Sequence, residues 1–377
     1  MNPLITTLIT IGVVLGGVLG ACSYLIWLER KIAAWMQDRV GPNRVGVYGL
    51  LQPIADGLKF LLKEDVIPAH VDKVLYLLSP TISVMTTMLA LAVVPVGPTS
   101  ADSTSWQAMI APGIDIGIVF IFAVTSLAVY GIILGGWASN NKYSALGSLR
   151  ASAQVVSYEI PLGMSILGVA LLTGSLNLET ILQRQAEAGV WGWNIWFQPL
   201  AAMIFFTSAL AESNRLPFDL PECEQELVGG YHTEYSALKF AMFFLAEYTH
   251  VITVSFLMSI VFFGGWHFPG IATPQSNYAG AWIVKFAVLH TKVLACITFI
   301  MLLRWTLPRF RFDQLMGLAW KVFIPLSLCN VICTMFVRQF SLSWWWLLPA
   351  SLALVIVAGL ISMTPSPKRP ASHLQHL

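Results

Sequence analysis

Charge is scarce in this sequence: Asp, Glu, Lys and Arg together make up only 11% of its 377 residues. Because a soluble domain typically carries about a quarter of its residues as charged side chains, this composition excludes an ordinary soluble protein. Hydrophobic residues make up 56% of the chain, and several apolar runs exceed the roughly 18 to 20 residues that a helix needs to cross a bilayer. The apolar–polar alternation of barrel strands is missing. We therefore expect an all-α integral membrane protein.

Motifs for cofactor and metal binding are missing as well. The five cysteines are scattered without a CxxC pair, and Cys329 and Cys333, one helical turn apart, are better explained by apolar packing. The chain has no GxGxxG or Walker loop, no HExxH, no GxSxG and no His/Cys cluster with metal-ligand spacing. We therefore expect no metal site and no cofactor bound by this chain, which would serve chemistry that a partner performs.

Apolar runs of spanning length predict about nine transmembrane helices. Their approximate ranges are 4–28, 74–96, 114–137, 156–172, 195–211, 237–264, 282–303, 315–337 and 344–363. The first run has neither a basic segment before it nor a small-residue cleavage site after it, so we expect it to stay as a helix rather than be removed as a signal peptide. The chain is predicted to be a single polytopic membrane domain, 1–363, with a polar C-terminal tail, 364–377.

Basic residues are distributed unevenly between the two sets of loops. The loops after odd-numbered helices hold 14 of them, whereas the opposite loops hold two, Arg184 and Arg338. Since Lys and Arg favour the cytoplasmic side of a membrane, we expect the N-terminus outside and the loop after the fifth helix inside. Tryptophans at 191, 193, 196 and 344–346 fall at the predicted outer ends, as an interfacial aromatic belt would.

The segment 29–71, between the first two helices, is too polar to span a membrane. It begins with a continued helical pattern, which a Gly/Pro-rich turn at 41–46 ends. Residues 50–62 then place Leu and Ile at helical spacing, with Asp56 and Lys59 among them. That pattern predicts an amphipathic helix lying in the cytoplasmic-side membrane interface. The alternative is an ordinary surface helix packed on the protein.

Acidic residues concentrate in and around one loop, 212–236. Only two basic residues, Arg215 and Lys239, fall in the wider stretch up to Glu247, and two prolines and a Gly-Gly pair interrupt any helix within the loop. Seven of the chain's 19 acids lie in this stretch: Glu212, Asp219, Glu222, Glu224, Glu226, Glu234 and Glu247. A merely solvated loop would not need acids at both of its membrane edges, so we predict a functional loop.

Ionisable side chains also fall inside predicted helices, where each costs roughly 2.5 to 3.5 kcal/mol on insertion and is therefore a functional candidate. Glu159 is expected to open the fourth helix and Glu212 to close the fifth, while Glu247 and Lys292 lie within the sixth and seventh. Carboxyl groups desolvated near one another can hold or pass protons. We interpret these four residues as a proton or charge relay; the alternative is structural ion pairing, such as Glu247 with Lys292.

Four long blocks of sequence, in order along the chain, resemble one known family. They read LERKIAAWMQDRVGPNRVGVYGLLQPIADGLKFLLKE, GWASNNKYSALGSLRASAQVVSYEIP, AESNRLPFDLPECEQELVGGYHTEYSALKF and RWTLPRFRFDQLMGLAWK. They closely resemble the H subunit of proton-translocating NADH:quinone oxidoreductase, respiratory complex I. The resemblance implies a helical bundle that quinone enters from the bilayer, between the first helix, the interfacial helix and the sixth helix. It also implies quinone as substrate, and NADH, FMN and iron–sulfur clusters held by partner subunits. Those partners are the peripheral-arm quinone module and the small and antiporter-like membrane subunits, with no nucleic acid.

The resemblance further implies roles for individual residues by position. Residues near the quinone entrance and lower channel are Glu29, Arg30, Asp56 and Lys59. The quinone-chamber loop contributes Glu212, Arg215, Asp219, Glu222, Glu224 and Glu226. Buried carboxylates that carry charge or protons towards the antiporter-like subunits are Glu159 and Glu247, and the basic stretch that contacts the peripheral arm contains Arg304, Arg309, Arg311 and Asp313. Cys223, where alanine is commoner, and Lys285 depart from the family pattern.

Three alternatives remain at this point. A related membrane subunit of a hydrogenase or formate hydrogenlyase shares the fold but reduces no quinone, and the loop PFDLPECEQELVGGYHTEY favours the quinone enzyme. A stand-alone secondary transporter could use Glu247 and Lys292 as an ion site, although the repeats and broken helices of such transporters are missing. A hydrophobic scaffold without a site is disfavoured by the buried acids. We expect the plasma (inner) membrane of a bacterium rather than the mitochondrial inner membrane; the sequence leaves open the choice between ubiquinone and menaquinone, and between proton passage and charge coupling alone.

Overall fold

The computed structural model describes residues 3–98, 109–219, 228–275 and 280–363. Within these ranges the secondary structure is helical, apart from an isolated bridge between Phe268 and Ala272. The α-helices are α1 (Pro3–Met36), α2 (Gln52–Leu62), α3 (Lys73–Ala90), α4 (Gly117–Ser126), α5 (Ala128–Ala138), α6 (Lys142–Thr173), α7 (Leu178–Glu187), α8 (Asn194–Phe197), α9 (Pro199–Glu212), α11 (Ala237–Val261), α12 (Ala281–Thr306), α13 (Phe312–Leu318), α14 (Ile324–Gln339) and α15 (Leu347–Met363). A 3-10 turn, Gly230–His232, precedes α11, and a π-helical segment, Ala319–Phe323, joins α13 to α14.

The prediction of an all-helical membrane protein is confirmed. In the described part of the chain, seven helical stretches are long and apolar enough to cross a membrane, and two shorter apolar helices accompany them. Counted with α4–α5 and α13–α14 each as one stretch, these nine correspond in order to the nine predicted spans. The predicted amphipathic helix is also present, as α2.

The predicted start of the fourth helix was wrong. Helix α6 begins at Lys142, with Asn141 as its N-cap, so Glu159 lies near the middle of a 32-residue helix rather than at its start. Hydropathy missed the first turns because Ser and Gly score as weakly polar. In the structure these small residues let neighbouring backbone approach: a Cβ added to Gly147 would lie 2.7 Å from the Cα of Gly230.

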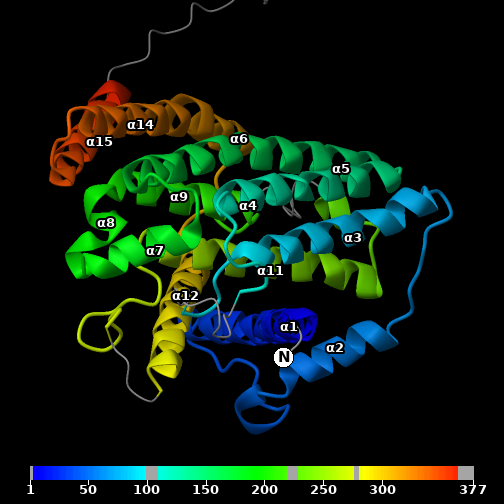
Figure 1. Ribbon diagram of the computed structural model, residues 1–377. Coiled ribbons are helices and arrows are strands. Elements are labelled where there is room, and N and C mark those ends of the chain that lie inside the picture. Colours follow the sequence, from blue (N-terminus) through cyan, green and yellow to red (C-terminus); the bar gives the residue numbers. More distant parts are fainter. Residues whose placement is uncertain (1–2, 99–108, 220–227, 276–279, 364–377) are drawn as a thin grey trace, which may run out of the picture.

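The helices stack across the molecule in a definite order. Helices α14 and α15 lie at one edge, α1 and α2 lie at the opposite edge, and α6, α9, α3 and α11 fill the interior between them (Figure 1). Helix α6 packs against α5, α9 and α14, while α11 contacts α1, α3, α9 and α12. Helix α12 runs across the direction of α1 in Figure 1. The central position of α6 and α11 explains why both carry buried polar side chains.

The loops meet at two separate ends of the bundle, as alternating spans require. At one end, the stretch that joins the first two spans contacts the loop before α11: Val66 N donates to Ser236 Oγ at 3.3 Å, and Asp72 N donates to Ala138 O at 3.1 Å. At the other end, Ile195 N donates to Phe262 O at 3.2 Å, and the rings of Trp191 and Trp345 lie 6.3 Å apart. The loops after odd-numbered spans therefore gather at the first end.

Helix α2 presents its apolar side chains away from the bundle. Leu50, Ile54, Leu58, Leu61 and Leu62 are all exposed, Leu62 by 84%, and no residue of α2 is buried. Its opposite side faces α1 and α11. An apolar stripe of this kind is typical of a helix at a membrane interface and favours that prediction over an ordinary surface helix packed on the protein.

Candidate functional site

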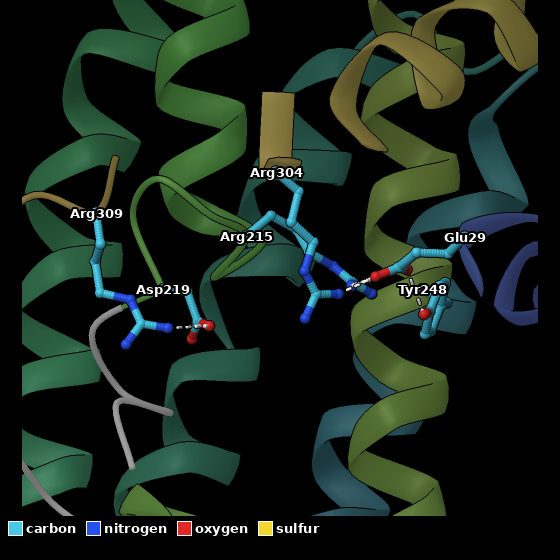
Figure 2. Close-up of polar contacts among 6 residues, drawn as sticks. All are labelled: Glu29, Arg215, Asp219, Tyr248, Arg304 and Arg309. Carbon is cyan, nitrogen blue, oxygen red and sulfur yellow. Dashed lines mark hydrogen bonds and ion pairs between the residues drawn. The ribbon is translucent and has the colours of Figure 1, made fainter. Parts of the chain in front are cut away.

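The most concentrated charge cluster gathers around the buried carboxylate of Glu29, on α1. Arg215, from the segment after α9, donates to Glu29 Oε2 at 3.2 Å, and Tyr248, on α11, donates to the same oxygen at 2.6 Å. Arg304, at the end of α12, pairs with Oε1. Figure 2 shows the two guanidinium groups approaching Glu29 from one side and the Tyr248 hydroxyl from another. The Arg215 guanidinium also lies over the Tyr248 ring, 4.3 Å from its centroid.

A second ion pair lies beside this cluster. Arg309 Nη2 is 3.4 Å from Asp219 Oδ2 (Figure 2), the side chain of Asp219 being 9% exposed. The rings of Phe218 and Phe310 stack at 5.6 Å, and Phe310 N donates to Pro217 O. The segment after α12 is therefore fastened to the start of the acidic loop.

A cavity of about 380 Å³ opens between α1, α2 and α11. Most of its wall is apolar, with Trp27, Phe60 and Phe244 among the lining side chains. Its polar lining comes from Ser23, from Tyr248, and from Arg30 and Asp56, which pair at 2.8 Å. Lys59 approaches the same carboxylate at 3.8 Å. Because Tyr248 also donates to Glu29, the cavity reaches the charge cluster directly.

Two further carboxylates line an interior cavity of about 60 Å³. Glu212, at the end of α9, and Glu247, on α11, line it together with His250, and Tyr231 donates to Glu247 Oε1 at 3.4 Å. Glu159, partly buried on α6, is close enough to Glu212 for their carboxyl groups to repel each other. The structure thus brings together the three carboxylates that the sequence assigned to a relay.

Lys292 lies elsewhere. Its ammonium donates to the backbone carbonyls of Phe263, Gly265 and His267 at 2.7, 2.9 and 2.7 Å, just beyond the end of α11. It also lies over the Trp193 ring, 4.3 Å from the centroid. The suggested pair with Glu247 is not formed. Membership of Lys292 in a relay stays a prediction.

The remaining predicted site residues divide into two groups. Arg311 and Asp313 form a pair at 3.8 Å in which both side chains are 74% exposed, and they are available to a partner. Glu222, Glu224 and Glu226 lie outside the described residues, as does Cys223. In the described ranges, no group of three or more His, Cys, Asp or Glu side chains is arranged to hold a metal ion.

Further polar contacts lie between α3 and the loop before α11. Glu234 accepts from Asn141 at 2.7 Å through its carboxylate and from the Tyr76 hydroxyl at 2.7 Å through its carbonyl, and Lys239 pairs with Asp65. Burial raises the pKa of Tyr235, stacked on Tyr76, to about 12. The interior cavity is also lined by hydroxyls that sequence reasoning missed: Ser83, Thr87, Thr125 and Ser213. Ser79, Ser83 and Thr87, spaced four apart within an apolar run, are a pattern that could have drawn attention to that face of α3.

Fold and site together define a class: a multi-pass helical membrane protein that holds buried carboxylates and arginines inside its bundle. The sequence matches the family described as NADH dehydrogenase over residues 9–335. It is 49% identical to one of the NADH-quinone oxidoreductase H subunits of Koribacter versatilis, over 88% of this chain and 96% of that protein. It is 46% identical to an H subunit of Cytophaga hutchinsonii, over 88% and 94% of the two chains. It is 47% identical to the H subunit of Thermomicrobium roseum, over 88% and 95%.

The chain therefore belongs to the NADH dehydrogenase family, among the H subunits of NADH-quinone oxidoreductase, complex I. The resemblance found in the four sequence blocks is confirmed. The protein is a multi-pass membrane subunit of that enzyme, and its membership implies other complex I subunits as partners.

Proposed function

We propose that this subunit forms the quinone entrance and binding chamber of proton-translocating complex I. We further propose that it couples quinone reduction to proton translocation through its acid-rich loop and buried carboxylates. The observation that carries the proposal is the cavity of about 380 Å³ between α1, α2 and α11. It lies where the family resemblance puts the route from the bilayer.

The chemistry of this cavity suits an isoprenoid quinone. A quinone tail needs an apolar slot, which the Trp27, Phe60 and Phe244 side chains offer. A headgroup needs hydrogen-bonding partners, and Arg30, Asp56 and Tyr248 line the same space. The exposed apolar stripe of α2 would seat this helix in the bilayer interface, with the cavity opening beside it.

Reduction of the headgroup changes the charge that its surroundings must balance, because quinone takes up two electrons and two protons. Tyr248 contacts both the cavity and Glu29. In a low-dielectric interior, charges at Glu29, Arg215 and Arg304 interact strongly over several ångströms. We therefore assign this cluster the role of sensing the redox state, while NADH, FMN and iron–sulfur clusters belong to partner subunits.

The interior cavity at Glu212 and Glu247 provides the next step in the proposed coupling, the transfer of protons or charge away from the quinone chamber. Both carboxylates line the same cavity, and Glu159 extends the series on α6. We propose that these groups carry protons or charge onward, and that the loop residues Glu222, Glu224 and Glu226 take part in the same coupling. The basic stretch after α12 would contact the peripheral arm at the cytoplasmic side; it contains Arg309, Arg311 and also Asp313.

Gly57 offers a direct test of the entrance, because it lines the cavity and a Cβ added there meets nothing within 4 Å. Gly57→Phe has an open Cβ position, and it should narrow the cavity and raise the apparent KM for quinone severalfold. Gly20→Phe is the matched control: its Cβ position on α1 is equally open, and it does not line this cavity. Both variants are assayed in the intact complex, and NADH oxidation by a water-soluble acceptor reports assembly. An unchanged KM in Gly57→Phe would count against the entrance.

Coupling has its own test at Glu247. Glu247→Gln keeps the side-chain shape but cannot carry a proton, so fewer protons should be translocated per NADH oxidised in reconstituted vesicles. Tyr231→Phe, which removes the hydroxyl that donates to Glu247, should have a smaller effect. Native stoichiometry in Glu247→Gln would favour a structural carboxylate.

A further inference from the structure

His250 is a titratable side chain that the proposed relay does not yet use. It lies on α11, one turn after Glu247, so the two side chains are neighbours on the helix surface. His250 is only 8% exposed, and its Nε2 lies 3.6 Å from Oε1 of Glu212. No described side chain or backbone group forms a hydrogen bond with Nε2. A buried imidazole nitrogen aimed at a buried carboxylate needs an explanation.

The space around the His250 ring explains why its buried nitrogen has no hydrogen-bond partner among the described groups. His250, Glu212 and Glu247 line the same interior cavity, along with hydroxyl groups from α3, α4 and the segment after α9. Its volume of about 60 Å³ has room for a few waters, since one water needs roughly 10 to 15 Å³ measured in this way. At 3.6 Å, the gap to Glu212 is one that a bridging water or a small ring rotation closes.

We propose that His250 exchanges protons between Glu247 and Glu212, and so forms the bridge between the carboxylates of α11 and α9. The inference rests on the proposed coupling role of those two residues and adds a group to it. An arriving proton leaves the Glu247 carboxyl group and forms an N–H bond on the imidazole. The imidazolium then releases the proton from Nε2 to the Glu212 carboxylate, which becomes a carboxylic acid. One proton has moved, and the ring is neutral again.

Histidine suits this position for a chemical reason. A neutral imidazole has one donor and one acceptor nitrogen, so it can receive a proton on one side and release one on the other. An amide side chain can form the same hydrogen bonds but cannot carry the proton. The groups that act on the ring electrostatically are Glu212 from α9, Glu247 from its own helix, and Glu159 from α6 through Glu212. Tyr231 contacts it through Glu247.

The test uses two isosteres, His250→Asn and His250→Gln, in the intact complex reconstituted in vesicles. Asn and Gln reproduce hydrogen bonds from different edges of the ring, so a purely structural histidine would be rescued by one of them. We expect neither to be rescued: both should lose proton translocation and slow quinone-coupled turnover roughly a hundredfold, the lower end of the range for one lost proton-transfer group. NADH oxidation by a water-soluble acceptor should stay native, which shows that the complex assembles.

His290→Asn is the matched control, because this histidine also lies on a spanning helix but stacks on Phe286, away from the cavity. It should translocate protons as the native enzyme does. Native translocation in either His250 variant, or an equal loss in His290→Asn, overturns the inference. Glu247→Gln and Glu212→Gln separate the two levels of the argument. If they lose translocation while the His250 variants keep it, only the role of His250 fails; if they too pump normally, the proposed relay fails as a whole.

Discussion

The carboxylate of Glu29 forms ion pairs with two guanidinium groups, those of Arg215 and Arg304. Glu29 accepts from Arg215, Arg304 and the Tyr248 hydroxyl. Tyr248 also lines the apolar cavity, so this side chain joins the cavity to the charge cluster. The cluster therefore links α1, α11, α12 and the segment after α9, and the redox-sensing role proposed above uses this same contact.

Glu29→Gln tests the structural part of this arrangement. The substitution removes the negative charge that Arg215 and Arg304 both contact, and removing one partner from a buried ion pair costs roughly 3 to 5 kcal/mol. Tyr248→Phe removes one hydroxyl donor and no charge, which should cost about 1 kcal/mol. We expect the apparent Tm of the detergent-solubilised complex to fall clearly more for Glu29→Gln than for Tyr248→Phe. Equal shifts would show that the charge balance at Glu29 contributes little.

Residues of this kind are predictable from the sequence one by one, but their partners are not. A charged side chain in an apolar run costs free energy on membrane insertion, so Glu212 and Glu247 can be recognised as functional candidates from the sequence. Spacing rules reach only three or four residues along a helix, whereas Glu29 and Arg304 are 275 positions apart. Glu29, expected near the entrance, is buried against the cavity-lining Tyr248, and Arg304 pairs with it; the entrance role of Glu29 and the peripheral-arm contact of Arg304 stay predictions.

At the scale of whole elements, three cations donate to backbone carbonyls at the end of one helix and just beyond the end of another. Arg184 and Arg338 donate to Thr173 O and Leu171 O at the end of α6, and Lys292 donates to three carbonyls beyond the end of α11. Positive charge is stabilising at a helix C-terminus, where carbonyls lack partners. Arg184 and Arg338 are the two exceptions to the distribution of basic residues between the loops. Their charges are used within the fold, so they need not weaken the orientation argument.

Lys292→Met should loosen the segment after α11. Three carbonyls lose a charged donor, at a cost of roughly 2 to 3 kcal/mol. Burial and the positive charge of Lys292 lower the pKa of His267, so the substitution should also raise that pKa by removing the second cause. Because the carbonyls of this segment lose their donor, hydrogen–deuterium exchange of the backbone amides in residues 264–272 should become faster. Lys285→Met on the same helix is the control, because its ammonium lies over the Trp266 ring, 4.8 Å from the centroid, and caps no helix in the described contacts. Equal exchange in the two variants would contradict the cap.

Elements were predictable to different degrees for a physical reason. Helices such as α1 and α12 can be predicted from the length of their apolar runs, because apolar runs of this length are typical of helices that cross a bilayer. The first turns of α6 did not, since small polar residues pack closely without raising hydropathy. The π-helical segment Ala319–Phe323 was not expected either. Its position follows from packing, in which Trp320 donates to Ser157 Oγ at 3.2 Å and Tyr158 donates to Leu315 O at 2.9 Å, contacts between distant segments that no local pattern records.

At the scale of the whole molecule, much of the apolar surface is exposed, on α1 and α14 as well as on α2. A soluble monomer rarely exposes apolar patches on this scale, so lipid and the other chains of the complex must cover them. The two-ended arrangement of the loops fixes which of them share a side. The orientation in the membrane then depends on basic residues alone: the end with Lys142 is predicted to be cytoplasmic, and the end with Glu187 external.

Two single-cysteine variants in an otherwise cysteine-free chain test this orientation. Lys142→Cys marks the start of α6 and Glu187→Cys marks the end of α7, both at exposed positions. A membrane-impermeant maleimide should label Glu187→Cys in right-side-out vesicles and Lys142→Cys in inside-out vesicles, because the reagent reaches only the outer face of each preparation. The reverse result would mean that the orientation is inverted while the fold stands. Labelling of both from one side would contradict the two-ended bundle itself, since 32 residues of α6 separate the end at Lys142 from the other.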